Sequence, residues 1–147
     1  MSGRKRTYAA SLATLLSDRR DEARETEQWH ERILGGLEFE AVEKVKARAS
    51  LTDAEIAPLL GIAEATLRRA RASGATLDVS TSDRLYRLSK AIAIAEEVLE
   101  GAPNAMTWLR RPQPALGGQV PLQLLVTQAG ADEVETLLRR IDYGVYT

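Results

Sequence analysis

Residues 105–147 read AMTWLRRPQPALGGQVPLQLLVTQAGADEVETLLRRIDYGVYT, and this stretch decides the fold expected for the rest of the chain. Its turn-forming residues are closely spaced. Pro112 ends any preceding helix, because proline lacks an amide donor and disfavours helix in the residue before it. Gly117-Gly118 permits a tight reversal, and Pro121 suits the first position of a short helix. This spacing predicts a compact helical unit rather than a tail.

A longer helix is predicted near the end of the chain. The apolar residues that follow Gly130 have the i, i+3, i+4, i+7 spacing of one buried helical face: Val134, Leu137, Leu138 and Ile141. The sequence then finishes in Tyr143-Gly144-Val145-Tyr146-Thr147, which is apolar, aromatic and uncharged. The residues alone leave two interpretations of this end, a segment folded onto its own core or a frayed tail.

The whole stretch resembles the C-terminal toxin-binding domain of the Xre/MbcA/ParS family, bacterial antitoxins that are typically paired with a RES-domain toxin. The resemblance covers residues 105–147 without an obvious gap. It is carried by many fixed spacings: Trp108-Leu109, Pro112, Ala115-Leu116-Gly117-Gly118, Pro121-Leu122, Leu125, Thr127, Gly130-Ala131, Val134, Leu137-Leu138, Ile141 and Tyr143-Gly144-Val145.

The resemblance implies that this domain binds a cognate RES-domain toxin and that its end occludes the toxin's active-site cleft. Toxins of this class consume NAD, so occlusion keeps the NAD pool intact. Tyrosine suits such an interface, because it combines a large apolar ring with a polar tip. Trp108 and Leu116 are expected in the domain's own core. The expected toxin-binding residues are Arg139, Arg140, Tyr143, Gly144, Val145, Tyr146 and Thr147.

Length and composition agree with a small globular protein. A chain of 147 residues makes one domain or two small ones, and its 44% hydrophobic and 28% charged residues are ordinary for that class. The absence of cysteine excludes disulfides and thiolate chemistry. No apolar run approaches the roughly 20 residues that span a bilayer, and no signal peptide is recognisable. We therefore expect a cytoplasmic protein with no membrane partner.

The net charge of −1 hides an uneven distribution. Acidic residues outnumber basic ones nine to four over residues 18–43, whereas basic residues outnumber acidic ones six to two over residues 68–90. A local basic face is what phosphate binding needs. The alternative is a solvated helix face whose charges pair within the molecule.

A helix-turn-helix is predicted in the middle of the chain, after a helix over residues 39–49. Thr52 and Glu55 have the spacing of a capping box, and the helix they begin is expected to end at Gly61. A second helix is expected over residues 63–72. The apolar, small and turn positions of the motif are Ile56, Ala57, Leu60, Gly61, Ile62, Leu67 and Ala70.

Two residues depart from the ideal motif. Pro58 lies inside the first helix, where proline typically costs about 3 kcal/mol. Ala63 stands where Ser or Thr usually caps the second helix, a loss of about 1 kcal/mol. These departures leave open an adaptor role without DNA binding.

If the second helix recognises operator DNA, its outward side chains include Glu64, Thr66, Arg68 and Arg69. Arg68 or Arg69 can fork to guanine O6 and N7. Glu64 either accepts from a cytosine amine or complements the positive helix N-terminus. The side chains expected on phosphates, which fix register without reading sequence, are Arg71, Arg84, Arg87 and Lys90.

Three segments are predicted: an N-terminal helical and charged extension (1–36), the helix-turn-helix domain (37–100) and the toxin-binding domain (101–147). The extension contains a short helix over residues 8–16 and a charged one over 17–31. Residues 77–79 are expected as an extended link before a long helix over 83–100, which Ser80 or Ser82 caps. That helix either joins the parts of one monomer or forms the twofold interface of a homodimer.

The sequence contains no catalytic constellation. His30 is the single histidine and lies in the charged N-terminal segment, so a His-based triad or metal site has little to build on. No phosphate-binding glycine motif is present. The prediction is an all-α, non-enzymatic antitoxin without a metal or cofactor, which also represses its own operon. The alternative is a helix-turn-helix transcriptional regulator whose C-terminal domain only dimerises.

Overall fold

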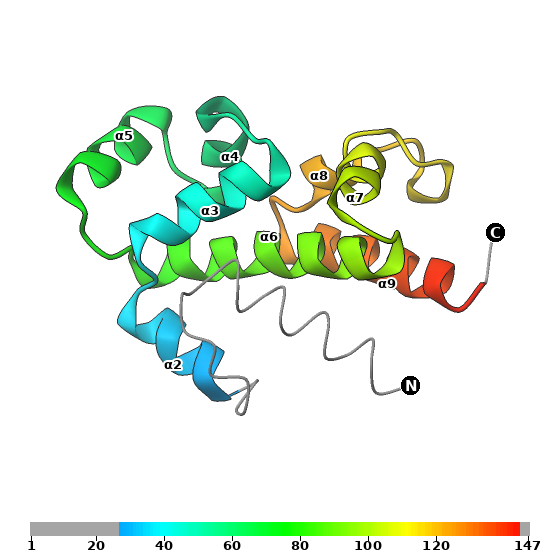
Figure 1. The fold of residues 1–147 in the computed structure, drawn as a ribbon, viewed down its shortest axis with the longest axis horizontal. Helices are drawn as coiled ribbons and strands as arrows, with labels where there is room; N and C mark the ends of the chain where they lie inside the picture. The colour runs from blue at the N-terminus through cyan, green and yellow to red at the C-terminus, as the bar shows by residue number, and fades with distance from the viewer. Residues whose placement is uncertain (1–26, 145–147) are drawn as a thin grey trace.

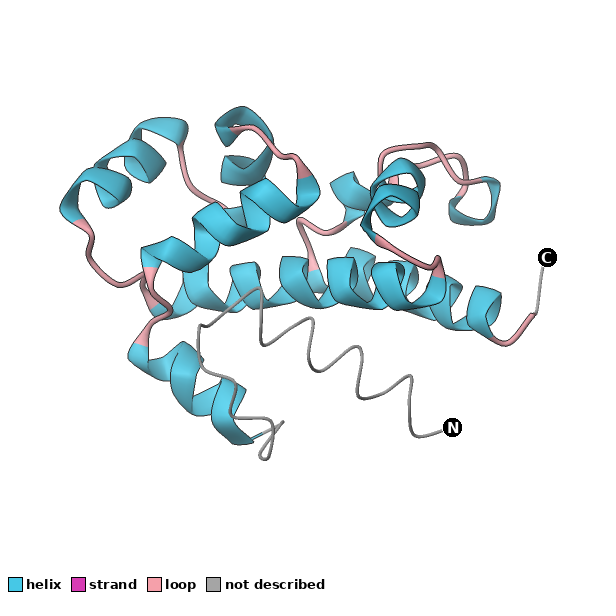
Figure 2. Ribbon diagram, in the orientation of Figure 1, coloured by secondary structure: helices cyan, strands magenta, loops and turns pink. Residues whose placement is uncertain are grey.

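A computed structural model describes residues 27–144 of the chain. Within this range the protein is all-helical, with one isolated bridge between Gln113 and Gln119 and no longer strand (Figures 1 and 2). The predicted fold class is therefore confirmed. The expected helix over residues 8–16 and the C-terminal residues 145–147 lie outside the described residues. Of the expected charged segment, the structure describes helix α2 (Glu27–Gly35).

The helix-turn-helix is formed by α4 (Asp53–Leu60) and α5 (Glu64–Ser73), after α3 (Phe39–Ala49). The capping box is present, since the Thr52 hydroxyl accepts from the Glu55 amide at 3.2 Å and the Glu55 carboxylate accepts from the Thr52 amide at 3.1 Å. Gly61 ends α4 at φ +70°, a conformation that glycine adopts without strain. Ala63 provides no side-chain cap to α5. These four observations follow the sequence prediction.

Helix α6 (Val79–Val98) starts earlier than predicted. The expectation that Ser80 or Ser82 caps it is wrong, because the carboxylate of Asp78 accepts from the Thr81 amide at 2.7 Å and begins the helix one turn sooner. The Ser82 hydroxyl is buried instead and accepts from the Leu37 amide at 2.9 Å. The extended link before the helix consequently ends at Asp78.

Helix α6 is the central helix of the described fold. It contacts α2, α3, α4, α7 (Ala102–Leu109) and α9 (Gln128–Asp142), and α9 runs beside it in Figure 1. Residues 91–96 are all buried. Six consecutive buried residues exceed one helical turn, so this part of α6 is covered around its whole circumference. The core therefore continues from the helix-turn-helix into the C-terminal helices.

The C-terminal third folds as α7, the 3-10 turn Pro114–Leu116, α8 (Pro121–Leu124) and α9. Pro121 begins a short helix as predicted, Leu116 is buried and Trp108 is half-buried against the core. The prediction that Gly130 precedes the last helix is wrong. Thr127 caps α9, its hydroxyl accepting from the Gly130 amide at 2.9 Å, so Gly130 lies in the first turn.

Gly130 is required by close packing between α8 and α9. A Cβ at this position would collide with the carbonyl oxygen of Leu124 and approach its Cα to 3.1 Å. We expect Gly130→Ala to lower the free energy of unfolding by about 1–3 kcal/mol, the usual effect of overpacking, in urea denaturation. Gly35→Ala is the matched control, since a Cβ at Gly35 meets nothing within 4 Å. Equal stability of the two variants would contradict this account.

Candidate functional site

One face of α5 presents accessible cations. The Arg68 side chain is 61% exposed and lies 3.7 Å from the Glu64 carboxylate, one turn earlier. Arg69 is also exposed and donates to the Thr66 hydroxyl at 3.2 Å. Exposed pairs of this kind contribute little stability and exchange readily for other partners. The structure thus brings together four of the predicted DNA-contacting residues on one helix.

Arg71 has a different environment from its neighbours on α5. Its guanidinium donates to Glu43 at 2.8 Å and to Asp53 at 2.8 and 3.1 Å, and it lies 5.6 Å from the ring centroid of Phe39. Lys46 also pairs with Asp53 at 2.5 Å. The hydrogen bonds from Arg71, and next those from Lys46, hold the pKa of Asp53 far below its usual range. Arg71 therefore ties α5 to α3 and α4, whereas the sequence predicts a phosphate contact there.

The two predicted arginines on α6 also differ from one another. Arg87 donates to the Gln128 side chain at 3.1 Å and to the Val126 carbonyl at 3.5 Å, so it joins α6 to the segment before α9. Arg84 is half-buried, and its guanidinium covers Gly61 in the turn of the motif, where a Cβ would collide with it. Arg84 therefore lies beside the helix-turn-helix, as a phosphate contact would. Among the described residues, no carboxylate is within ion-pair distance of it.

The end of α9 presents a second accessible surface. Arg139 and Arg140 are exposed on its last turn, and Arg139 lies 3.4 Å from Glu135 one turn earlier. Tyr143 follows the helix with 79% of its surface exposed, and Gly144 reverses the backbone at φ +74°. The structure brings these four predicted residues together, whereas the predicted residues Val145, Tyr146 and Thr147 lie outside the described part.

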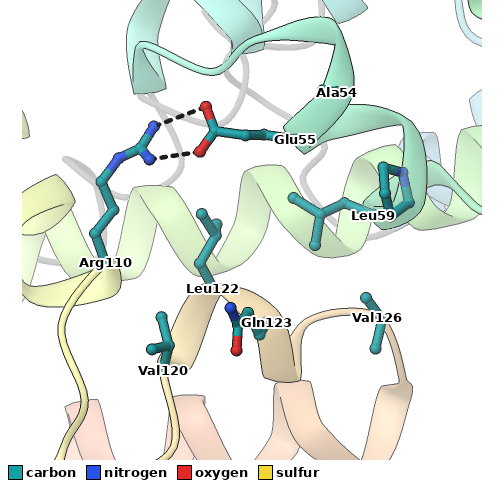
Figure 3. A pocket seen from close by; sticks show the side chains of 9 residues that line it. Ala54, Glu55, Leu59, Arg110, Val120, Leu122, Gln123 and Val126 are labelled. Atoms are coloured by element: carbon teal, nitrogen blue, oxygen red, sulfur yellow. Dashed lines mark hydrogen bonds and ion pairs between the residues drawn. The ribbon is translucent and has the colours of Figure 1, made fainter. Parts of the chain in front are cut away.

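Arg110, which the sequence analysis does not single out, connects the C-terminal helices to the helix-turn-helix. It follows α7, and its guanidinium donates to the Glu55 carboxylate at 2.5 and 3.4 Å (Figure 3). It also donates to the Ser50 carbonyl at 2.8 Å. The bond from Arg110 is the main cause that lowers the pKa of Glu55. Glu55 also completes the capping box of α4. The C-terminal helices therefore hold the N-terminus of the first helix of the motif.

Comparison with known proteins gives the family. Residues 28–90 match the model of the antitoxin Xre-like helix-turn-helix domain, and residues 95–144 match the antitoxin Xre/MbcA/ParS C-terminal toxin-binding domain. The chain is 34% identical to the antitoxin Xre of Pseudomonas putida over 115 residues, which are 78% of this chain and 71% of that protein. The chain belongs to the Xre antitoxin family. The resemblance noted in the sequence is confirmed.

Further relatives of this antitoxin carry similar names. It is 30% identical to the antitoxin Xre of Yersinia enterocolitica over 113 residues, 76% of each chain. It is 32% identical over 96 residues to a protein of Sphingobium sp. named Prs ADP-ribosylating antitoxin, 59% of this chain and 60% of that protein. Family membership implies a cognate toxin as a partner and DNA as a ligand of the helix-turn-helix, which favours a regulatory protein over an enzyme.

The described residues include neither a membrane-spanning helix nor a metal-binding cluster. None of the helices within residues 27–144 is long and apolar enough to cross a membrane. In the same part of the chain, His, Asp and Glu side chains form no group of three or more that could hold a metal ion. On the exposure of their side chains, the candidate surfaces of this antitoxin are the face of α5 and the end of α9.

The Asp53 ion pairs give a pH-dependent prediction. A carboxylate whose pKa is lower in the folded than in the unfolded state, where it is about 3.9, stabilises the fold above that value. Its contribution is lost as the pH falls through the folded-state pKa. Asp53→Asn is therefore expected to lower the unfolding free energy at pH 7, with a smaller difference from wild type as the pH falls below about 4.

Urea denaturation at pH 7, 4 and 3 measures this difference. Asp83→Asn is the matched control, because its carboxylate is exposed and its ion-pair partner Arg87 lies 3.9 Å away. A loss of stability that is the same for both variants, or that does not change with pH, would show that the Asp53 ion pairs do not support the motif.

Proposed function

We propose that this antitoxin neutralises a NAD-consuming RES-domain toxin through its C-terminal domain and represses its own operon through α5. The observation that carries the first half is the end of α9, where Tyr143 is 79% exposed inside the region that matches the toxin-binding domain. An exposed tyrosine offers a large apolar ring with a polar tip, which suits an anchor that enters a partner's cleft.

The toxin-binding surface extends from Arg139 and Arg140 over Tyr143 and Gly144 into Val145, Tyr146 and Thr147. The two arginines supply charge-assisted hydrogen bonds to acidic groups at the rim of the toxin cleft, and the tyrosines enter it. Occlusion by a chain end blocks substrate entry without requiring any chemistry from the antitoxin. This role agrees with the location of the matched domain and with the exposure of Arg139, Arg140 and Tyr143.

The chemistry of the toxin is supported by one relative. The Sphingobium protein is named an ADP-ribosylating antitoxin, and ADP-ribosylation consumes NAD as the donor of the ADP-ribose group. We infer that the partner of this antitoxin likewise uses NAD, either by degrading it or by transferring ADP-ribose to another target. Measuring the NAD content of cells that express the toxin tests this inference directly.

The proposed operator contact is made by the accessible face of α5. Arg68 and Arg69 read guanine in the major groove, with Glu64 and Thr66 beside them, and Arg84 holds a phosphate at the turn of the motif. Arg71 and Arg87 belong instead to the intramolecular contacts described above. Because residues 91–96 of α6 are buried in one chain, the homodimer that would bind paired half-sites uses another surface.

A pair of matched double variants separates the two activities. Arg68→Ala with Arg69→Ala is expected to weaken operator binding at least about 30-fold, since each guanine contact contributes about 1–3 kcal/mol, and to leave toxin binding unchanged. Arg139→Ala with Arg140→Ala removes the same charge and is expected to weaken toxin binding while leaving operator binding unchanged. Fluorescence anisotropy with operator DNA and calorimetric titration with toxin measure both. Loss of both activities in either variant would show that the surfaces are not separate.

Truncation after Ile141 tests the occlusion mechanism. The protein encoded next to this antitoxin is induced alone, with the full chain and with the truncated chain, while growth and cellular NAD are followed. We expect toxicity with NAD loss that the full chain relieves and the truncated chain does not, while operator binding is retained by both. Full rescue by the truncated chain would refute occlusion by the terminus, and toxicity that the full chain cannot relieve would favour a transcriptional regulator that only dimerises.

A further inference from the structure

The region that matches the toxin-binding domain exposes a second large apolar side chain besides Tyr143. Val126, between α8 and α9, is 41% exposed. Helix α9 has 15 residues and separates the two side chains by about 22 Å, at 1.5 Å per residue. A contact confined to the end of α9 therefore leaves Val126 in water and gives no reason for its exposure.

Val126 lies at the rim of a groove of ≈ 330 Å³ between α4 and α8 (Figure 3). Pro58 and Leu59 of α4 form one wall, and Val120 and Leu122 form the other. The Arg110–Glu55 ion pair closes one end, and because its charges neutralise each other, it presents no net charge to an occupant. The groove is large enough for a few apolar side chains and is lined mainly by apolar groups.

Pro58 adds a polar feature to this groove. Proline has no amide hydrogen, so Ala54, four residues earlier, lacks the usual helical donor for its carbonyl oxygen. Ala54 and Pro58 both line the groove, and the Gln123 side chain lies on the opposite wall. The groove thus combines apolar walls with the side-chain amide of Gln123, which suits an uncharged segment of a protein partner.

We propose that this groove is a second docking site for the toxin, filled by an apolar side chain of an uncharged toxin segment. The occupant is the toxin because three of the groove's lining residues, Val120, Leu122 and Val126, lie in the matched toxin-binding domain. The proposal rests on toxin binding by this domain, as proposed above, and not on the use of NAD by the toxin.

The groove has a consequence for both domains. One of its walls belongs to α4, the first helix of the helix-turn-helix. A toxin side chain in the groove touches Pro58 and Leu59 directly, so bound toxin contacts the DNA-binding domain as well as the toxin-binding domain. The bound toxin therefore bridges the helix-turn-helix and the C-terminal helices, which Arg110 already joins through Glu55.

The chain offers a close control for a charge introduced at Val126. Val79, the first residue of α6, is 45% exposed, and it does not line the groove. Val126→Glu and Val79→Glu therefore make the same substitution at two similarly exposed valines. We expect Val126→Glu to weaken toxin binding at least about tenfold, because a carboxylate would be buried in an apolar contact, and Val79→Glu to change it less than about twofold.

A second experiment detects contact without adding charge. The chain has no cysteine, so Val126→Cys and Val79→Cys each provide a single attachment point for a photo-activated cross-linker. The labelled full-length antitoxins are mixed with the protein encoded next to this gene and irradiated. We expect covalent capture of that protein from position 126 and not from position 79. Thermal melting of each variant establishes that it is folded.

The outcomes separate this proposal from the proposed function. Wild-type affinity of the folded Val126→Glu variant, or no capture from position 126 while the wild-type complex forms, overturns the groove proposal alone. Capture of a second antitoxin chain from position 126 overturns it as well, by assigning the groove to a dimer. Failure of the wild-type antitoxin to bind its neighbour's product overturns both proposals.

Discussion

The burial of α6 around its whole circumference is the constraint on which the rest of the structure depends. Between residues 91 and 96 the helix alternates alanine with larger side chains, so neighbouring helices approach closely from several directions. Burial of Glu96 there would be costly without a partner. Arg48 supplies one from α3, with two hydrogen bonds of 3.0 and 2.6 Å to the carboxylate. The pair fixes α3, the helix before the helix-turn-helix, to α6. Helices α7 and α9 cover other sides of α6.

Local signals made much of the fold predictable from sequence. The Thr52–Glu55 capping box, Gly61 and Pro121 act over a few residues, and the structure confirms each of them. Where several residues could cap the same helix, its first residue is harder to predict from sequence. Ser80, Ser82 and Asp78 are all suitable caps, and only the burial of Ser82 against Leu37, 45 residues away, decides among them. The start of α9 depends on a similar contact, because Gly130 can lie in its first turn only where Leu124 packs closely against it.

The candidate site was only partly predictable, because the availability of an arginine depends on distant residues. Arg69 and Arg71 are two positions apart and look equivalent in the sequence. In the structure, Arg71 pairs with Glu43 and Asp53, 28 and 18 residues away, whereas Arg69 donates to the Thr66 hydroxyl on its own helix. Arg110, in contrast, forms a contact that the sequence does not predict. Its partner Glu55 lies 55 residues away, so no local pattern reveals the connection.

The dependence of α6 on its neighbours has a consequence for turnover of the protein. Helices α7 and α9 follow α6 in the sequence and complete its burial. A protease cut between α6 and α9 would detach these helices and expose the apolar side chains of α6 that they cover. The remaining helix-turn-helix fragment would expose these side chains and the unpaired Glu55 carboxylate, and such fragments are readily degraded further. Degradation of this antitoxin is therefore expected to be all-or-none. A single cut would end both of its activities together, without leaving a stable DNA-binding remnant.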